Sequence, residues 1–209
     1  TGLPEGRNLS TREVSKWPHI IQLSYILYDT DLNKTCCCVD DIIKLDETVA
    51  ISEKSIEMHG ITRSVSMRKG IPIAEAINNF NIALSEADLV IAHNISFDKK
   101  MIKVESFRLG IEQNFDYGSG YGIKEYCTMK NTVNVCKIER TSENGNVYFK
   151  YPTLTELHTH LFKFTPKNTH DSMADVLICL RCYYTLVNNK DVVNQGCSII
   201  NKLYNLYCT

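Results

Sequence analysis

The pattern of apolar positions first predicts extended segments. Residues 20–28 and 35–45 are rich in branched and aromatic side chains, and they flank a polar turn at 29–33. Two such runs around a turn predict a β-hairpin. Shorter apolar runs at 88–92 and 123–127 predict further strands, the first of them buried. The chain is therefore expected to contain a sheet of several strands.

Apolar residues at helical spacing predict five helices between and after these strands. Local signals fix several of their ends, because short polar side chains cap helix N-termini and glycine favours C-terminal caps. The expected helices are 52–59 closed by Gly60, 73–86, a helix capped by Ser96 that runs to Leu109 before Gly110, a helix to Phe162 opened by the Thr153–Glu156 capping box, and one that begins near Asp171.

Strands interleaved with helices indicate an α/β fold whose sheet is covered on both faces. Because the leading hairpin pairs antiparallel strands, the sheet is expected to be mixed. A glycine-rich loop at 118–122 precedes the strand at 123–127.

Two further segments lie outside this core pattern. Residues 135–151 predict an added hairpin. Such an insertion is either a contact for a partner or substrate or a neutral surface elaboration, and the neutral interpretation is favoured. Residues 189–195 are polar and linker-like. A short amphipathic helix is expected after them, lined by Ile199, Leu203 and Leu206.

Composition is that of an ordinary globular protein. Of the 209 residues, 44% are hydrophobic and 22% charged, which excludes a disordered chain. No apolar run approaches the roughly 20 residues of a membrane-spanning helix, so no membrane partner is expected. The net charge of −1 argues against a protein that coats nucleic acid, which needs many cations. It permits a compact site that grips a few nucleotides with the help of metal ions.

Cysteine usage bears on location and on metal chemistry. The nine cysteines, which include the run 36–38, do not form the pattern of a secreted disulfide framework. The expected location is therefore intracellular, cytoplasmic or nuclear, where thiols stay reduced. Cys179 and Cys182 form a C-x-x-C, but a structural zinc needs about four ligands and no second pair lies nearby. Two buried small side chains are the expected role.

Two polar segments carry candidate chemistry. In the first, Asp98 arrives in the first turn of a helix just after a strand. The helix dipole favours a carboxylate there, so a structural charge explains Asp98 as well as catalysis does. In the second, His170 precedes the last strong helix and Asp175 lies about one and a half turns inside it, on an apolar face. A satisfied core carboxylate or a His–Asp ion pair is the alternative there.

Together these segments, A-H-N-x-x-F-D and H-x-x-x-x-D, resemble the second and third motifs of the DEDDh, proofreading-type 3′–5′ exonuclease family. Other stretches resemble the family in order and spacing, and the resemblance runs from residue 1 to about 187. They are Thr1-Gly2-Leu3-Pro4, the strand from Pro18 to Leu23, Ile56-Glu57-Met58-His59-Gly60-Ile61-Thr62, and Cys127-Thr128-Met129. The resemblance implies a ribonuclease H-like, three-layer α/β/α fold with a mixed central sheet.

The resemblance also implies a hydrolase that cuts phosphodiester bonds at nucleic-acid 3′ ends with two divalent metal ions, Mg²⁺ or Mn²⁺. Two metals about 3.5–4 Å apart activate a water and stabilise the leaving oxygen, and carboxylates suit such hard cations. Asp98 and Asp175 are then two of the four carboxylates, and His170 is the general base. A histidine that titrates near about pH 6.5 suits that role.

Substrate contacts follow from the same resemblance. Gly2 and Leu3 match the stretch that meets the terminal base and 3′-hydroxyl, and His59 matches a histidine near the terminal nucleotides. Asn94 and Phe97 match positions that line the pocket. Structural roles are open for these residues, as a core residue for Phe97 and a frayed end for Leu3. The other histidines are expected to be surface, packing or hydrogen-bonded structural residues: His19, His93, His158 and His160.

One part of the family pattern is absent. The D-x-E that precedes T-G-L-P in the family, on its central strand, does not occur in this sequence. We therefore expect an exonuclease domain at 1–188 that is truncated at its N-terminus and lacks that strand, with weak metal binding and little turnover. Residues 189–209 are expected to be a linker and a short helix that lead to, or dock on, another element.

His170 favours an enzyme over a non-catalytic nucleic-acid-binding or polymerase-accessory module, because binding alone needs no general base. Single-stranded DNA, in proofreading or repair and with a polymerase as a candidate partner, is the expected substrate. RNA trimming is the alternative, because contacts to a 2′-hydroxyl cannot be identified from one sequence.

Overall fold

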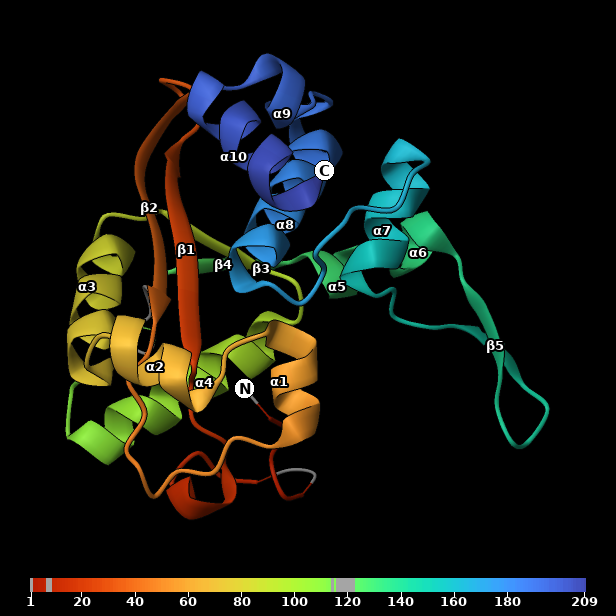
Figure 1. Cartoon of the computed structure of the whole chain (residues 1–209). Coiled ribbons are helices and arrows are strands. Elements are labelled where there is room, and N and C mark those ends of the chain that lie inside the picture. The colour runs from red at the N-terminus through yellow and green to blue at the C-terminus, as the bar shows by residue number, and fades with distance from the viewer. Residues whose placement is uncertain (1, 7–8, 114, 116–122) are drawn as a thin grey trace. The chain divides into compact units, whose positions relative to one another are not determined.

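The structure, a computed structural model, describes residues 2–6, 9–113, 115 and 123–209. The glycine-rich loop predicted at 118–122 lies outside the described residues. Strands and helices alternate along the chain, as expected (Figure 1). After a 3-10 turn at Val14–Lys16 the elements are β1 (Gln22–Asp29), β2 (Lys34–Ile42), α1 (Glu53–His59), α2 (Arg63–Lys69), α3 (Ile73–Ser85), β3 (Leu89–Ala92), α4 (Ile95–Leu109), β4 (Lys124–Cys127), α5 (Thr128–Asn131), α6 (Val133–Cys136), β5 (Glu139–Thr141), β6 (Val147–Phe149), α7 (Leu154–Phe162), α8 (Ser172–Asn188), α9 (Val192–Gln195) and α10 (Ser198–Cys208).

The α/β class predicted from the sequence is confirmed. Among the described residues the strands form three two-stranded sheets, which pair β1 with β2, β3 with β4, and β5 with β6. A single parallel bridge between Ile43 and Ile71 extends the pairing beyond β2. The separate pairing of β1–β2 and β3–β4 is consistent with the mixed sheet without its central strand that the sequence predicts.

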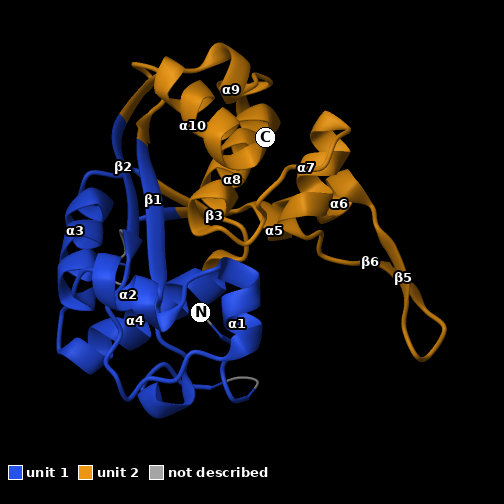
Figure 2. Cartoon of the chain, in the orientation of Figure 1, with its two compact units in different colours: residues 1–27, 36–88, 96–124 blue, residues 28–35, 89–95, 125–209 orange. Residues whose placement is uncertain are grey.

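The chain forms two compact units, shown in different colours in Figure 2. Unit 1 comprises residues 1–27, 36–88 and 96–124, and unit 2 comprises residues 28–35, 89–95 and 125–209. The candidate residues Leu3, His59 and Asp98 belong to unit 1, whereas His170 and Asp175 belong to unit 2.

In unit 1 the segment that follows β2 is held from two sides. The backbone N–H of Ile43 donates to the carbonyl of Ile21 at 2.9 Å. The hydroxyl of Ser66, on α2, donates to the carbonyl of Ile43 at 2.7 Å and accepts from the N–H of Leu45 at 3.0 Å. Because Ser66 is fully buried, these two bonds satisfy a polar group that would otherwise destabilise the core.

A buried carboxylate joins α4 to the segment before β1. Glu105 is 2% exposed and accepts hydrogen bonds at 2.9 Å from the N–H of Ile20 and from the guanidinium of Arg108. Arg108 also donates to backbone carbonyls within residues 14–18. Burial opposes ionisation of the carboxylate, but hydrogen bonds from His19 and Ile20 and the nearby guanidinium outweigh it and lower the pKa of Glu105. This network fixes α4 within unit 1.

In unit 2, α8 is the central helix, since it packs against β3, α7, α9 and α10. Its side chains Leu177, Ile178 and Cys182 are fully buried. The helix expected after residue 195 is present as α10, but the predicted buried face is wrong. The side chains of Ile199 and Leu206 are 48% and 73% exposed, whereas the neighbouring stripe is buried: Ile200, Tyr204 and Cys208. Both stripes have helical spacing, and a hydrogen bond from the Tyr204 hydroxyl into the core accompanies burial of the second.

The predicted linker at 189–195 is only partly irregular. Residues 192–195 form α9, and Val192 and Val193 are buried. Asp191 caps this helix, because its carboxylate accepts from the N–H of Val193 at 3.1 Å. The polar residues that suggested a linker therefore include a helix cap. The domain bounds 1–188 and 189–209 stay a prediction.

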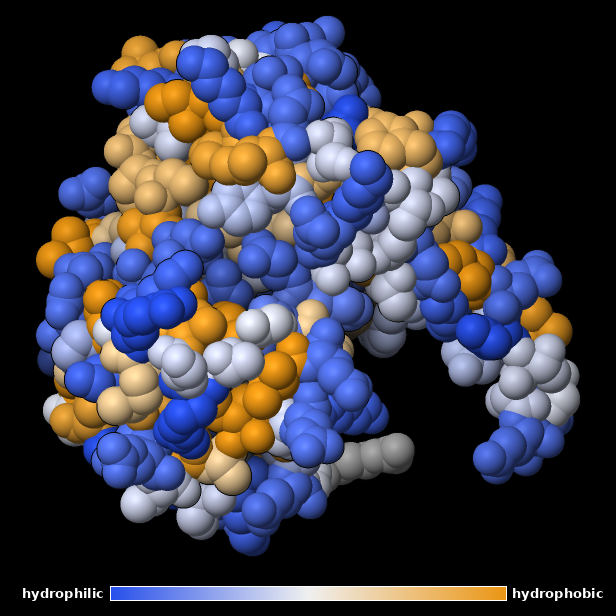
Figure 3. Space-filling model, viewed as in Figure 1, coloured by the Kyte–Doolittle hydropathy of each residue, from blue (hydrophilic) through white to orange (hydrophobic). Residues whose placement is uncertain are grey.

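The added hairpin is confirmed as the antiparallel pair β5–β6 of unit 2. Gly145, with φ of 79°, lies in the turn, where a positive φ favours glycine. The hairpin extends away from α6 and α7, which precede and follow it (Figure 1). Hydrophilic side chains cover its tip (Figure 3).

The cysteines of the chain are all reduced. All nine cysteines lie in the described part of the chain, and no disulfide joins any of them. Cys179 and Cys182 are buried, as predicted. Within the described ranges, no helix has the length and hydropathy needed to cross a bilayer.

Candidate active site

The two candidate aspartates occupy equivalent positions on two helices. Asp98 is the fourth residue of α4, and Asp175 is the fourth residue of α8. A residue with left-handed backbone lies just before each helix, Asn94 with φ of 71° and His170 with φ of 86°. The first turn of a helix favours a carboxylate, since its amides and its dipole are positive there. Each aspartate is therefore held at the start of a helix that follows a sharp turn.

The structure corrects two sequence predictions at these turns. Ser96 is not the helix cap, because α4 already begins at residue 95 and the left-handed Asn94 makes the turn before it. Asp175 lies in the first turn of α8 rather than one and a half turns inside. The cap of α8 is Asp171, whose carboxylate accepts from the N–H of Ala174 at 2.9 Å.

His170 and Asp175 lie together in unit 2. The backbone N–H of His170 donates to Oδ1 of Asp175 across 3.4 Å, at the long end of the hydrogen-bond range. His170 is exposed and Asp175 is half-buried. Burial raises the pKa of Asp175, and the N–H and charge of His170 only partly offset this effect. The charged form of this carboxylate is thus incompletely stabilised, so an added cation would favour it.

The candidate residues of unit 1 have different exposures. Asp98 is exposed, and Phe97 is half-buried rather than part of the core. Leu3 is 84% exposed, and Gly2 is half-buried beside Pro18. Their roles at a substrate stay predictions.

His59 ends α1 and has one nitrogen in use. Its Nδ1 lies 3.0 Å from the backbone N–H of Ile61, which can only donate, so Nδ1 accepts and the proton resides on Nε2. Burial lowers the pKa of His59 and so favours this neutral ring. Its Nε2 is buried and has no acceptor among the residues that the structure describes. A buried donor without a partner is costly, so this N–H would be stabilised by an acceptor that reaches it.

His93 supports the turn that precedes α4. Its Nε2 donates to the carbonyl of Pro152 at 3.1 Å, and its Nδ1 lies 2.9 Å from the hydroxyl of Thr128. Burial lowers the pKa of His93. With both nitrogens engaged next to Asn94, His93 is the packing and supporting residue that the sequence predicts.

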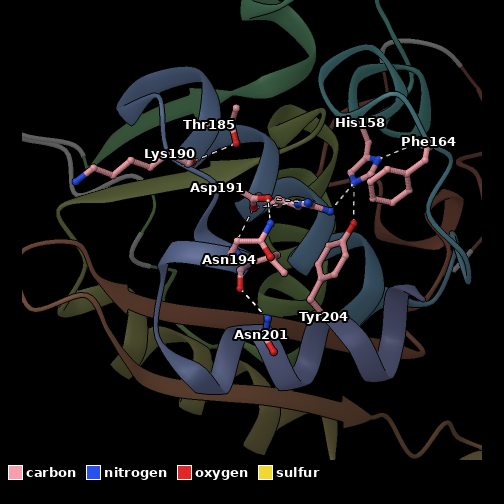
Figure 4. Close-up of polar contacts among 10 residues, drawn as sticks. His158, Phe164, Thr185, Lys190, Asp191, Asn194, Asn201 and Tyr204 are labelled. Carbon is pink, nitrogen blue, oxygen red and sulfur yellow. Dashed lines mark hydrogen bonds and ion pairs between the residues drawn. The ribbon is translucent and has the colours of Figure 1, made fainter.

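His158 is a satisfied core histidine, which was one of the alternatives for it. It is fully buried. Its Nδ1 donates to the carbonyl of Phe164 at 3.1 Å, and its Nε2 accepts from the hydroxyl of Tyr204 at 2.7 Å (Figure 4). Burial lowers its pKa to about 4. His158 therefore has no nitrogen available for chemistry.

Sequence reasoning missed the cation beside His158. Arg181, on α8, is 6% exposed. Its guanidinium forms a bidentate ion pair with the carboxylate of Asp191, with N–O distances of 2.7 and 3.0 Å. Its guanidinium also stacks over the ring of Phe162, 4.0 Å from the centroid. The available signal was a single arginine in the apolar stretch of α8, since a buried charge requires a partner. This ion pair fastens the segment of α9 to the helix that carries Asp175.

The donor types suit divalent metal ions, although the described residues form no complete cluster. Within the part of the chain that the structure describes, no three His, Cys, Asp or Glu side chains form one metal-binding group. Asp98 and Asp175 supply carboxylate oxygens, which are the ligands that Mg²⁺ and Mn²⁺ prefer. At Asp175 the incomplete stabilisation of the charged form fits a cation-binding role.

Comparison with known proteins adds one finding. A protein-family model described as Exonuclease, of the RNase T type, matches residues 10–183. The match covers most of the chain and both polar segments. No individual curated protein matches the chain.

Proposed function

Because the chain belongs to this exonuclease family, we propose that it removes nucleotides from the 3′ end of a nucleic acid by metal-dependent hydrolysis of phosphodiester bonds. Single-stranded DNA, in proofreading or repair, is the proposed substrate, and RNA is the alternative. The observation that carries the proposal is the pair in unit 2, a half-buried Asp175 with a raised pKa next to an exposed His170.

Asp98 and Asp175 are proposed to hold the metal ions through their carboxylate oxygens. When bound, such ions supply a more acidic water and a neutralised leaving oxygen. Burial at Asp175 destabilises the bare carboxylate, so a cation there would restore its charged form. A neutral amide at this position would keep the shape of the side chain and lose the charge.

His170 is proposed to take the proton from the attacking water. Its ring is exposed at the turn before α8, where water and substrate can reach it. The hydrogen bond from the backbone N–H of His170 to Oδ1 of Asp175 holds the backbone of His170 next to this carboxylate. General-base catalysis by a positioned histidine contributes roughly 10²–10⁴-fold to a rate.

The proposed substrate contacts extend the site to the end of the nucleic acid. The buried Nε2–H of His59 is the best-defined donor for an oxygen of the terminal nucleotides. Gly2, Leu3, Asn94 and Phe97 are proposed to contact the terminal nucleotides as well. A polymerase is a proposed partner, on the basis of the resemblance alone.

A nuclease assay with the full-length protein tests this proposal. Single-stranded DNA and RNA of the same sequence, labelled at the 5′ end, are incubated with Mg²⁺, with Mn²⁺ or with EDTA. Hydrolysis from the 3′ end should give a ladder of shrinking labelled products that EDTA abolishes. His170→Ala should retain Mn²⁺ binding and lose most of the rate. Cuts at internal positions, or immediate release of a labelled mononucleotide, would contradict the proposed direction.

A further inference from the structure

The hairpin at 137–151 has two chemically different faces. Residues that pair directly across an antiparallel ladder share a face, and the face alternates along each strand. Arg140 pairs with Tyr148, so the guanidinium and the phenol ring lie on the same face. The adjoining pairs, Glu139 with Phe149 and Thr141 with Val147, lie on the opposite face.

Neither face is covered within unit 2. Both strands are exposed along their whole length, and the side chains of Tyr148 and Phe149 are 52% and 40% exposed. An isolated two-stranded ribbon is marginally stable in water, and a cross-strand pair with an aromatic ring contributes about 0.2–1 kcal/mol to it. The rings therefore stabilise the ribbon slightly and still leave much of their surface exposed to another molecule.

The charges on the hairpin are not symmetric between its faces. The N–H of Lys150 donates to the carbonyl of Ile138 at 2.9 Å, which continues the ladder and puts Lys150 on the same side as Arg140. Lys150 is already paired with Glu156 at 2.6 Å. Arg140 forms no ion pair with any described residue, and Glu139 belongs to the other face. Arg140 is thus an available cation beside an exposed ring.

A cation next to an aromatic ring is a combination that binds single-stranded nucleic acid, because the ring stacks on a base and the cation pairs with a phosphate. We propose that the Arg140–Tyr148 face of the hairpin binds a single-stranded stretch of the nucleic acid on which the protein acts. This inference rests on the proposed function for the class of substrate. The hairpin residues take no part in the cleavage assigned to Asp98, His170 and Asp175.

The hairpin is connected to the candidate residues of its own unit. It precedes α7 directly, and α7 packs on α8, the helix that carries Asp175. A strand bound to the hairpin would therefore be held by the same unit as His170 and Asp175. The expected consequence is stronger retention of substrates long enough to reach the hairpin, without a change in the chemical step.

Fluorescence anisotropy of the full-length protein in EDTA measures this binding without cleavage. The probes are labelled oligo-dT and oligo-U of about 20 nucleotides, longer than the site of a typical stacking platform. The double variant Arg140→Gln, Tyr148→Ala should raise Kd about tenfold, since it removes a stacked base and a phosphate contact. It should also reduce the slope of log Kd against log salt by about 0.7.

Matched variants separate this role from a general effect on the hairpin. Tyr148→Phe keeps the ring and should bind as the wild type does. Phe149→Ala removes a ring from the opposite face and should leave Kd within about twofold, because a single exposed contact there meets no base. An equal loss in Phe149→Ala, a loss in Tyr148→Phe, no loss in the double variant, or no binding by the wild-type protein would each overturn the proposal.

A cleavage assay distinguishes failure of this inference from failure of the proposed function. In Mg²⁺ or Mn²⁺, the double variant should cleave a substrate of about three nucleotides at the wild-type rate. So short a strand is shorter than a typical stacking site of about 4–16 nucleotides, and it is not expected to reach the hairpin. Hairpin-dependent binding with no cleavage by the wild type would refute the proposed nuclease activity but support the proposed binding face. Cleavage with an unchanged Kd in the double variant would refute the binding face and keep the nuclease.

Discussion

Two histidines of unit 2 occupy opposite environments. His158 is fully buried, uses both ring nitrogens and has its pKa lowered to about 4. His170 is exposed, has a left-handed backbone and adjoins a carboxylate whose pKa is raised by burial. The difference lies in their partners. His158 is structural because both of its nitrogens are hydrogen-bonded, whereas His170 is accessible for chemistry because it is exposed beside a carboxylate whose charge is incompletely stabilised.

The same contrast applies to the charged groups beside the two histidines. Asp191 has a guanidinium partner, and both the ion pair with Arg181 and the cap of α9 hold it in its charged form. Asp175 accepts one long backbone bond from His170. The charged groups near His158 are therefore paired within the protein, whereas a bound cation would stabilise the charge of Asp175 beside His170. Variants that affect one region and spare the other test this distinction.

The largest effect is expected at Asp175. Asp175→Asn should lower the nuclease rate by at least about 10³-fold, because the charge proposed to bind a metal ion is lost while the shape is kept. Thermal unfolding should be unchanged or slightly higher in temperature, since a half-buried charge is removed. Asp171→Asn is the matched control, because asparagine caps a helix as well as aspartate does. Equal activity in Asp175→Asn and the wild type would show that Asp175 belongs to the structural region.

The next effect concerns the buried cation. Arg181→Met should lower the free energy of unfolding by about 3–5 kcal/mol, because Asp191 loses its partner within the protein. Urea unfolding followed by circular dichroism measures this. The double variant Arg181→Met, Asp191→Asn should recover much of the loss, since it removes both charges while asparagine keeps the cap of α9. A loss below about 1 kcal/mol in the single variant would match an exposed ion pair and contradict the description of a closed core cluster.

The third effect is a pH dependence of stability that arises from His158. The folded-state pKa of His158, about 4, lies below the unfolded value of about 6.5. Between these values the unfolded state binds more protons, so stability is fully present above about pH 6.5 and falls as the pH drops toward 4. The loss should reach no more than about 3 kcal/mol.

Unfolding free energies of the wild type, His158→Gln and His170→Gln across this pH range measure that effect. His158→Gln should be less stable at neutral pH and should show a flatter profile between pH values of about 6.5 and 4. His170→Gln is the comparison variant at an exposed histidine of the same unit. Parallel profiles for all three proteins would contradict the assignment of His158 as a neutral core histidine.

Much of the local structure could be predicted because its signals are local. Ser52 and Gly60 bound α1, and Thr153 with Glu156 forms the capping box of α7, as the sequence indicates. The buried face of α10 and the partners of Arg181 could not be predicted, because His158, Phe162 and Tyr204 come from other helices of unit 2. His170 and Asp175 are close along the chain, so their proximity follows from the helix start. The assignment of Asp98 to the same site comes from the family resemblance and stays a prediction.

The smallest effect is expected at His59, where one nitrogen is used and one is available. His59→Asn keeps an acceptor for the N–H of Ile61 but removes the Nε2 donor, and should raise KM about five- to tenfold. His59→Gln places an amide donor near the Nε2 position and should restore most of the affinity. Steady-state kinetics on single-stranded DNA measures both. Equal KM values for the wild type and His59→Asn would remove His59 from the substrate site.

The proposal that Asp98 and Asp175 bind the same metal ions, with His170 beside them as general base, is tested most directly by paramagnetic broadening in NMR. Substoichiometric Mn²⁺ is added to the isotope-labelled full-length protein, and the amide signals are compared with those of the Asp98→Asn variant. Broadening of the amides near 98 together with those of 170–176, and loss of both effects in the variant, is the predicted result. Broadening confined to one of the two segments, or unchanged at 170–176 in Asp98→Asn, would contradict a shared site.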